Sequence, residues 1–152
     1  MAEHWGLIEL PNTGGKGKGF LVPAEAATGV PFPIARAYWI HHWDRGHPRG
    51  GHAHRRIQQV FFCLQGKVQL NLRSADAVGG MYVLEEPHVG LWTAPLVWLE
   101  MESRSRDTIL LVLASGRHDE HEYIRNAEEY RLACAGLVRG VSPAPLAQGA
   151  AV

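Results

Sequence analysis

Short apolar runs that recur along most of the chain, each closed by turn-forming residues, constrain its fold more than any other feature. From "HWGLIEL" at 4–10 to "TILLVLA" at 108–114, such runs alternate with turn sequences such as "DRGHPRGG", "QGK" and "EEPHVG". Val68, Leu70 and Leu72 alternate with polar neighbours, which is the period of a half-buried strand. The runs "VFFCL" and "ILLVL" are apolar throughout, as expected for strands covered on both faces. Many short strands predict an all-β sandwich, jelly roll or small barrel.

The C-terminal part departs from this pattern. From Asp119 to Cys134, "DEHEYIRNAEEYRLAC" is rich in helix formers, with acidic residues at its start and Gly136 after its end. Its apolar residues, Tyr123 and Ile124 among them, recur at helical spacing. We therefore expect a short α-helix over this segment.

Length and charge indicate one domain without a nucleic-acid partner. The 152 residues suffice for a single core, and we expect one domain over residues 1–136, followed by a flexible Pro- and Ala-rich tail over residues 137–152. Lys plus Arg number 15, as do Asp plus Glu, and the sequence pI is about 7.1. This balance gives no indication of binding to nucleic acid or to a membrane surface.

Two further features favour a cytoplasmic location. The N-terminus "MAEHWGLIELPNTGG" lacks the basic and apolar regions of a secretion signal, and no apolar run approaches the roughly 18 residues of a membrane span. Cys63 and Cys134 form neither a CxxC motif nor a disulfide framework, so we interpret them as buried thiols.

The glycine- and lysine-rich stretch "GGKGKG" at 14–19 superficially suggests a phosphate-binding loop. It lacks the Walker spacing and precedes no helical pattern, so we interpret it as a flexible connection between strands. Its lysines, including Lys18, remain candidates for contact with an anionic ligand.

The motif that carries chemistry is His52-Ala53-His54. Two histidines at i and i+2 on a strand point to the same face. Inside a β-barrel, such a pair can hold a metal, move protons or simply hydrogen-bond within the core. Gln59, five residues after the pair, offers an amide, and an amide is a poor ligand for Zn²⁺ or Fe²⁺. Glu100 could complete a set of two histidines and a carboxylate, so the metal reading stays open.

The spacing HxH-x4-Q-x6-G, which ends at Gly66, resembles the cupin superfamily of jelly-roll barrels. Over residues 18–131, the ordered motifs "PRGGHAH", "GLWTAPLVWLEM", "LLVLAS" and "DEHEYIR" resemble one cupin branch more closely. This branch is the dTDP-sugar 3,4-ketoisomerases, which act on a dTDP-4-keto-6-deoxyhexose. The resemblance implies a cupin jelly roll and a homodimer that exchanges N-terminal strands.

The resemblance also implies a reaction and the residues that perform it. The keto group moves from C4 to C3 through an enediol, without metal or nicotinamide cofactor. His52 and His54 match the catalytic pair, and Tyr38 matches a tyrosine that bonds a sugar oxygen or an imidazole. Arg49 matches an arginine that would hold the pyrophosphate or polarise an oxyanion.

Five further positions are candidates for substrate binding. Arg36 shares a strand face with Tyr38, and a buried arginine needs an anionic partner such as pyrophosphate. Gln59 would face inward, and Trp98 would pack beside the ligand. Lys18 and Leu99 align with positions thought to influence product stereochemistry at C4, and both depart from the family pattern.

Two points stay open from the sequence. Leu99 and Glu100 are adjacent, so only one of them can face the barrel interior on a regular strand, and we expect Leu99. The alternatives to a ketoisomerase are a metal-dependent cupin that uses His52, His54 and Glu100, and a non-catalytic cupin that binds a sugar nucleotide.

Overall fold

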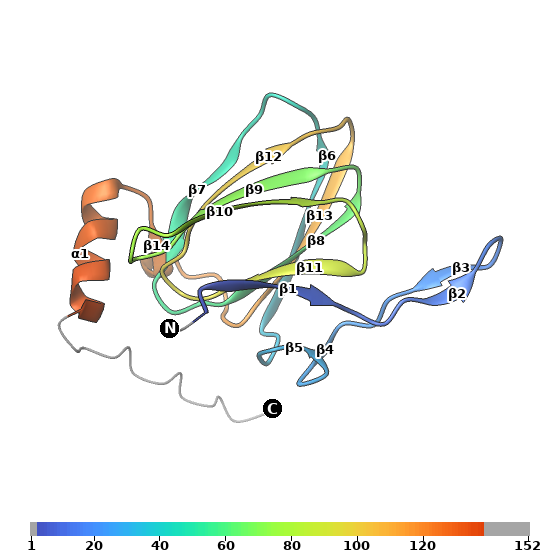
Figure 1. Cartoon of the computed structure of the whole chain (residues 1–152), viewed down its shortest axis with the longest axis horizontal. Helices are drawn as coiled ribbons and strands as arrows, with labels where there is room; N and C mark the ends of the chain where they lie inside the picture. The colour runs from blue at the N-terminus through green and yellow to red at the C-terminus, as the bar shows by residue number, and fades with distance from the viewer. Residues whose placement is uncertain (1–2, 139–152) are drawn as a thin grey trace.

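Two five-stranded sheets form the body of the protein in a computed structural model that describes residues 3–138 (Figure 1). The first sheet has the order β1-β11-β8-β13-β6 and the second β10-β9-β12-β7-β14, and every pairing within them is antiparallel. The first sheet consists of β1 (Trp5–Glu9), β11 (Val89–Thr93), β8 (Gln59–Gln65), β13 (Thr108–Ala114) and β6 (Arg36–Trp43). The second consists of β10 (Gly79–Leu84), β9 (Val68–Arg73), β12 (Trp98–Ser103), β7 (Arg49–His54) and β14 (Tyr123–Ile124).

The remaining elements lie outside the two sheets. They are β2 (Thr13–Gly15), β3 (Gly19–Leu21), β4 (Glu25–Ala26), β5 (Gly29–Val30), the 3₁₀ turn η1 (Glu120–Glu122) and the helix α1 (Ala127–Val138). The β2–β3 hairpin projects away from the body, whereas α1 lies beside β14 and β7 at the opposite end (Figure 1). No helix in the described range is both long and apolar enough to cross a bilayer.

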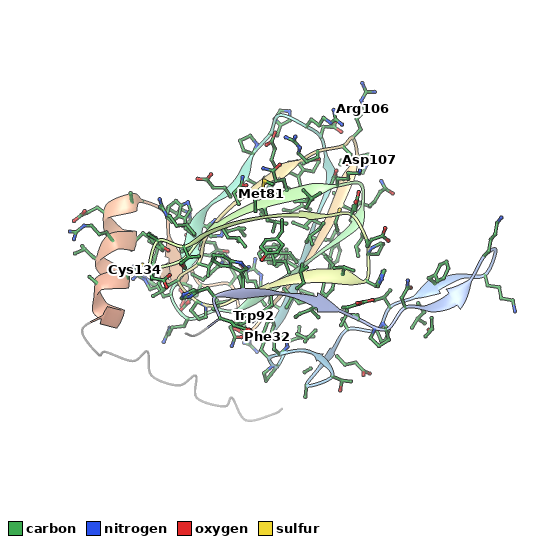
Figure 2. All side chains as sticks on the ribbon, in the orientation of Figure 1. Phe32, Met81, Trp92, Arg106, Asp107 and Cys134 are labelled. Carbon is green, nitrogen blue, oxygen red and sulfur yellow. The ribbon has the colours of Figure 1, made fainter. Side chains whose placement is uncertain are left out.

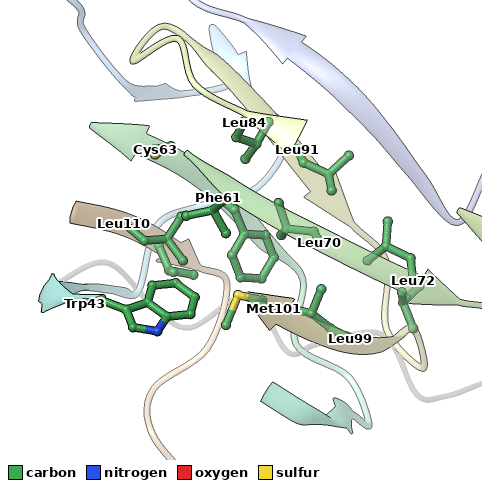
Figure 3. Close-up of a cluster of buried hydrophobic side chains, with 13 residues drawn as sticks. Trp43, Phe61, Cys63, Leu70, Leu72, Leu84, Leu91, Leu99, Met101 and Leu110 are labelled. Carbon is green, nitrogen blue, oxygen red and sulfur yellow. The ribbon is translucent and has the colours of Figure 1, made fainter. Parts of the chain in front are cut away.

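The main core fills the space between the two sheets. Val68, Leu70 and Leu72 on β9 are all buried there, which confirms the alternation predicted from the sequence. Phe61 of β8 and Leu110 of β13 meet them from the first sheet (Figure 3). Burial of side chains of this size stabilises the fold by roughly 1.5–3 kcal/mol each.

A second cluster covers the outer face of the first sheet and explains the uninterrupted apolar run "VFFCL". Val60 and Phe62 point to this outer side, while Phe61 points to the core. Leu10 and Phe32, from the segment between β1 and β6, pack over them (Figure 2). Strand β8 is therefore buried on both faces.

Helix α1 covers part of the outer face of the second sheet. Tyr130 and Cys134 of α1 pack against Ala53 of β7 and Ile124 of β14. The Tyr130 hydroxyl also donates to the carbonyl oxygens of Arg73 and Leu96, at 3.0 and 2.9 Å. The helix is thus held by both apolar packing and buried hydrogen bonds.

The predicted all-β class with one C-terminal helix is confirmed, but the predicted start of the helix is wrong. The helix begins at Ala127 instead of Asp119, because residues 120–124 form η1 and the short strand β14. Tyr123 and Ile124 pair with β7, and this contact overrides the local helical preference. At its other end the helix continues to Val138, past Cys134, where the helical segment was expected to end. Residues 139–152 of the predicted tail lie outside the described range.

Candidate active site

The two histidines of the HxH motif share the inner face of β7, at one end of the space between the sheets. The ring centroids of His52 and His54 lie 5.2 Å apart, with the ring planes at 89°. Ala53, between them, points to the opposite side and packs under α1. The shared face predicted from the i, i+2 spacing is therefore observed.

Two glycines before the motif determine how β7 lies against β12. Gly50 and Gly51 have φ values of +87° and +71°, which residues with a side chain rarely adopt. A Cβ on Gly50 would lie 2.7 Å from the Leu99 carbonyl oxygen. This close approach coincides with a register shift between Leu99 and Glu100 and leaves His52 opposite Leu99.

The first sheet supplies a tyrosine, a glutamine and an arginine to the same end of the molecule. Gln59 of β8 donates from Nε2 to the Tyr38 hydroxyl oxygen at 3.0 Å, so the hydroxyl keeps its own hydrogen to donate. The guanidinium of Arg36 lies 4.5 Å from the Tyr38 ring centroid and donates to Nδ1 of His118 at 3.3 Å. Both Tyr38 and Arg36 are half-buried, and Gln59 is buried.

Burial keeps both imidazoles uncharged at neutral pH. It is the largest cause that lowers the pKa of His54, to about 4, and the neighbouring His52 adds to the effect. Burial also lowers the pKa of His52. Among residues 3–138, neither ring nitrogen of His54 has a hydrogen-bond partner, although both nitrogens are buried. Two neutral imidazoles, of which His54 has both ring nitrogens free of hydrogen bonds, are suited to accept a proton.

Tyr38 is held in its protonated form. Burial raises the pKa of Tyr38 above its ordinary value, and the nearby Tyr123 acts in the same direction. The hydrogen bond from Gln59 and the charges of Arg36 and Arg49 oppose this shift without reversing it. A neutral phenol can donate a hydrogen bond to an oxyanion.

The structure brings some of the predicted residues together and leaves others apart. Arg49 is exposed on β7, and its charge reaches Tyr38. Leu99 faces inward, with only 4% of its surface exposed, and forms part of the core beside His52. Lys18 lies on the turn of the β2–β3 hairpin, which projects away from the body that holds the histidines (Figure 1).

Trp98 lies on the other side of β12 from the histidines. Because Leu99 points inward, alternation along the strand sends Trp98 outward. Its ring packs against Tyr130 of α1, with 5.3 Å between centroids. Its Nε1 donates to Glu100 at 3.4 Å, and Glu100 is exposed. Within this chain, Trp98 therefore lies on the opposite face of β12 from the histidines, and its packing beside a ligand stays a prediction.

The alternative hypothesis of a metal site, with His52, His54 and Glu100 as ligands, lacks its third ligand because Glu100 also points outward. Glu100 is on the outer face, and Gln59 uses its amide nitrogen to bond Tyr38. Within residues 3–138, no group of three or more His, Cys, Asp or Glu side chains is arranged to hold a metal ion. The donor set around His52 and His54 thus does not fit the usual catalytic shell of three protein ligands.

Sequence reasoning assigned no role to Tyr123, which the structure places against the histidines, or to Arg125 and His118, which contact the Tyr123 ring. The ring of Tyr123 on β14 packs at a tilt against both imidazoles, with its centroid 5.1 Å from that of His52 and 4.6 Å from that of His54. The Arg125 guanidinium lies 4.3 Å from the Tyr123 ring centroid, and the His118 ring is 5.7 Å away. The available signal was the motif "DEHEYIR", but reading it as helix hid the strand face that Tyr123 occupies.

Comparison with known proteins identifies the family. The family model described as FdtA: WxcM-like, C-terminal, matches residues 3–134. The chain belongs to this FdtA family. A curated relative, the TDP-4-oxo-6-deoxy-alpha-D-glucose-3,4-oxoisomerase of Aneurinibacillus thermoaerophilus, is 38% identical over 114 residues, which are 75% of this chain and 81% of the relative.

Solved structures give the same assignment. The sugar 3,4-ketoisomerase QdtA of Thermoanaerobacterium thermosaccharolyticum, in complex with TDP, superposes with a TM-score of 0.83 at 37% identity, covering 90% of this chain and 98% of that one. A histidine-to-asparagine variant of QdtA with TDP-4-keto-6-deoxyglucose gives 0.83 at 36% identity, covering 93% and 100%. The predicted resemblance to sugar-nucleotide 3,4-ketoisomerases, which are intramolecular oxidoreductases, is confirmed.

Proposed function

We propose that this protein is a 3,4-ketoisomerase that converts a dTDP-4-keto-6-deoxyhexose to the 3-keto isomer by proton transfer between histidines and sugar, without a metal. The observation that carries the proposal is the pair of neutral imidazoles on one face of β7, with a protonated tyrosine on the facing sheet. The names of the relatives supply the substrate class.

The reaction needs proton transfers that such a site can perform. The C3 proton is acidic because C3 is adjacent to the C4 carbonyl, and one neutral imidazole removes it. A proton is delivered to O4 to give the enediol, O3 then loses its proton, and C4 receives one, which leaves the carbonyl at C3. No atom is gained or lost in this sequence. Because His52 and His54 disfavour each other's charge, the pair carries one proton at a time.

Tyr38 would stabilise the charge that develops on the sugar oxygen. Its hydroxyl accepts from Gln59 and keeps a hydrogen to donate toward O4. A donor aimed at a developing oxyanion typically contributes about 10²–10³ in rate. Gln59 then serves to orient the phenol.

Three arginines near the histidines suit a pyrophosphate. Arg36 and Arg49 come from different sheets, and Arg125 follows β14. Guanidinium groups bind phosphate oxygens in bidentate fashion. In this proposal the sugar lies against the histidines, and the diphosphate lies toward the arginines.

The proposal includes a homodimer with exchanged N-terminal strands. The projecting β2–β3 hairpin exposes two large apolar side chains, Phe20 at 65% and Leu21 at 64%. The outer face of β6, β8 and β13 carries a depression that includes Trp39, itself 63% exposed, and Leu64. A second copy would cover both surfaces, and exchange would bring Lys18 toward the partner's site.

Leu99 and Lys18 would then shape the face of C4 that receives the proton. Leu99 has no proton to give, so delivery at C4 falls to one of the histidines or to a bound water. A cytoplasmic location remains part of the proposal, and it is supported by the two buried, unpaired thiols of Cys63 and Cys134.

The decisive experiment is to incubate the protein with dTDP-4-keto-6-deoxyglucose in D₂O and to follow the sugar protons by NMR. We expect loss of the C3 proton signal and growth of a 3-keto product. Binding without exchange at C3 would refute catalysis and favour the non-catalytic sugar-nucleotide-binding alternative. Turnover that is lost on chelation and restored by Mn²⁺, Fe²⁺ or Zn²⁺ would refute the metal-free reading.

A further inference from the structure

Tyr123 is the aromatic residue in closest contact with the two histidines. Its ring centroid lies 4.6 Å from that of His54 and 5.1 Å from that of His52, tilted by 55° and 58°. The pairing of β14 with β7 places Tyr123 directly opposite His54. The next residue, Ile124, points to the other side and packs under α1. One short strand thus holds an aromatic ring against both imidazoles.

The Tyr123 ring is itself held in place from its surroundings. Arg125 lies over the ring at 4.3 Å and is bound to Glu120 at 2.7 Å. The preceding η1 turn is anchored by Glu122, whose carboxylate accepts from the backbone N–H and Nε of Arg56, both at 2.8 Å. Such support limits how far the Tyr123 ring can move away from the imidazoles.

We propose that Tyr123 is a positioning residue whose ring packs against His52 and His54 and excludes water from His54. This inference rests on the proposed ketoisomerase function for its catalytic consequence, but its physical content concerns the imidazoles alone. The part of Tyr123 that acts is the ring. Its hydroxyl makes no hydrogen bond among the side-chain contacts of the described residues, whereas the ring contacts both histidines.

Four charged or titratable groups besides Tyr123 act on His54, and they come from several elements. They are His52 of β7, Arg36 of β6, Glu122 of η1 and Arg125 after β14. Among them only Glu122 favours the charged imidazole, and burial outweighs it. Burial is the larger cause of the low pKa of His54, and the Tyr123 ring contributes to that burial.

The test compares Tyr123→Phe, which keeps the ring, with Tyr123→Ala, which removes it. Ile124→Ala is the matched control, because it loses apolar contact on the same strand without touching an imidazole. The primary measurement is an NMR titration of the His52 and His54 imidazoles in the ligand-free protein, which needs no turnover. Thermal unfolding of each variant shows that the folded state is present.

We expect His54 to titrate with a pKa near 4 in the parent protein, in Tyr123→Phe and in Ile124→Ala, and markedly higher in Tyr123→Ala. If water reaches the His54 ring fully in Tyr123→Ala, the pKa of His54 returns to its ordinary value of 6.5. The fraction of His54 that is neutral is then at most about 30-fold lower than in the parent at pH 5 and about 4-fold lower at pH 6, with no loss at pH 8. The kcat of Tyr123→Ala should fall with the same pH profile, while KM changes little.

Three results would overturn the inference. The first is an unchanged His54 titration in Tyr123→Ala. The second is a shift in Tyr123→Phe as large as in Tyr123→Ala, which would assign the effect to the hydroxyl. The third is an equal shift in Ile124→Ala, which would reduce Tyr123 to general support of the strand. A shifted titration in an enzyme that never exchanges C3 would instead uphold Tyr123 and refute the proposed function.

Discussion

The neutral state of His54 predicts a specific loss of stability in mild acid. The folded-state pKa of His54 is about 4, whereas the ordinary value is 6.5. On acidification the unfolded chain therefore binds a proton first. The resulting destabilisation begins near pH 6.5, grows as the pH falls, and levels off near pH 4. His54 is only 6% exposed, so solvent does not screen this effect.

The magnitude follows from these two pKa values. Between pH 7.5 and pH 5, proton binding by the unfolded chain lowers the free energy of unfolding by about 2 kcal/mol. His54→Asn removes this titration while leaving all other ionisable groups in place. We therefore expect the pH-dependent loss between pH 7.5 and pH 5 to be about 2 kcal/mol smaller in the variant than in the parent.

The measurement is urea unfolding of both proteins at pH 7.5, 6 and 5, at one protein concentration. Any cavity that asparagine leaves lowers stability at every pH, and it cancels when each protein is compared with itself. Equal losses in the two proteins would show that His54 is not held neutral by burial. They would also remove the electrostatic basis for its role as a base.

Three other predictions test the site and its frame. His52→Asn or His54→Asn should lower kcat at least about 100-fold, as measured with dTDP-4-keto-6-deoxyglucose, and near-normal turnover in both would contradict their assignment. Gly50→Ala should lower the free energy of unfolding, measured in urea, by about 1–3 kcal/mol, because the new Cβ would clash with the β12 backbone at a residue of positive φ. Gly46→Ala is the control, since Gly46 also has a positive φ but lies in open space, and it should lower the free energy of unfolding by less. Replacing both Phe20 and Leu21 with serine should shift the mass found by analytical ultracentrifugation from dimer to monomer, and an unchanged mass would argue against exchange through the hairpin.

The strand content and the shared face of the histidines are local properties, and the sequence was sufficient for both. Side chains alternate along any strand, so the pattern at Val68, Leu70 and Leu72 identified their buried face without knowledge of the partner strands. The same alternation placed His52 and His54 together. It also meant that only one of Leu99 and Glu100 could face the interior, and the structure shows Leu99 inward and Glu100 exposed.

Long-range pairing accounts for what sequence reasoning missed. The residues around Tyr123 in the sequence predict a helix. Tyr123 lies in a strand because β14 pairs with the edge of β7. That edge is about 70 residues away along the chain, so no local pattern reports it. For this reason the local sequence did not predict the contact of the Tyr123 ring with both imidazoles.

The sequence alone determined the fold class, the family resemblance and the identity of the two candidate proton carriers, because these depend on residue types, spacings and alternation. Only the tertiary structure decided which side chains surround those carriers. It sent Trp98 to the outer face, left Lys18 on a projecting hairpin and brought Tyr123 against the imidazoles. Burial by such distant neighbours lowers the pKa of His54, so the chemistry of the histidines depends on contacts that their own segment does not encode.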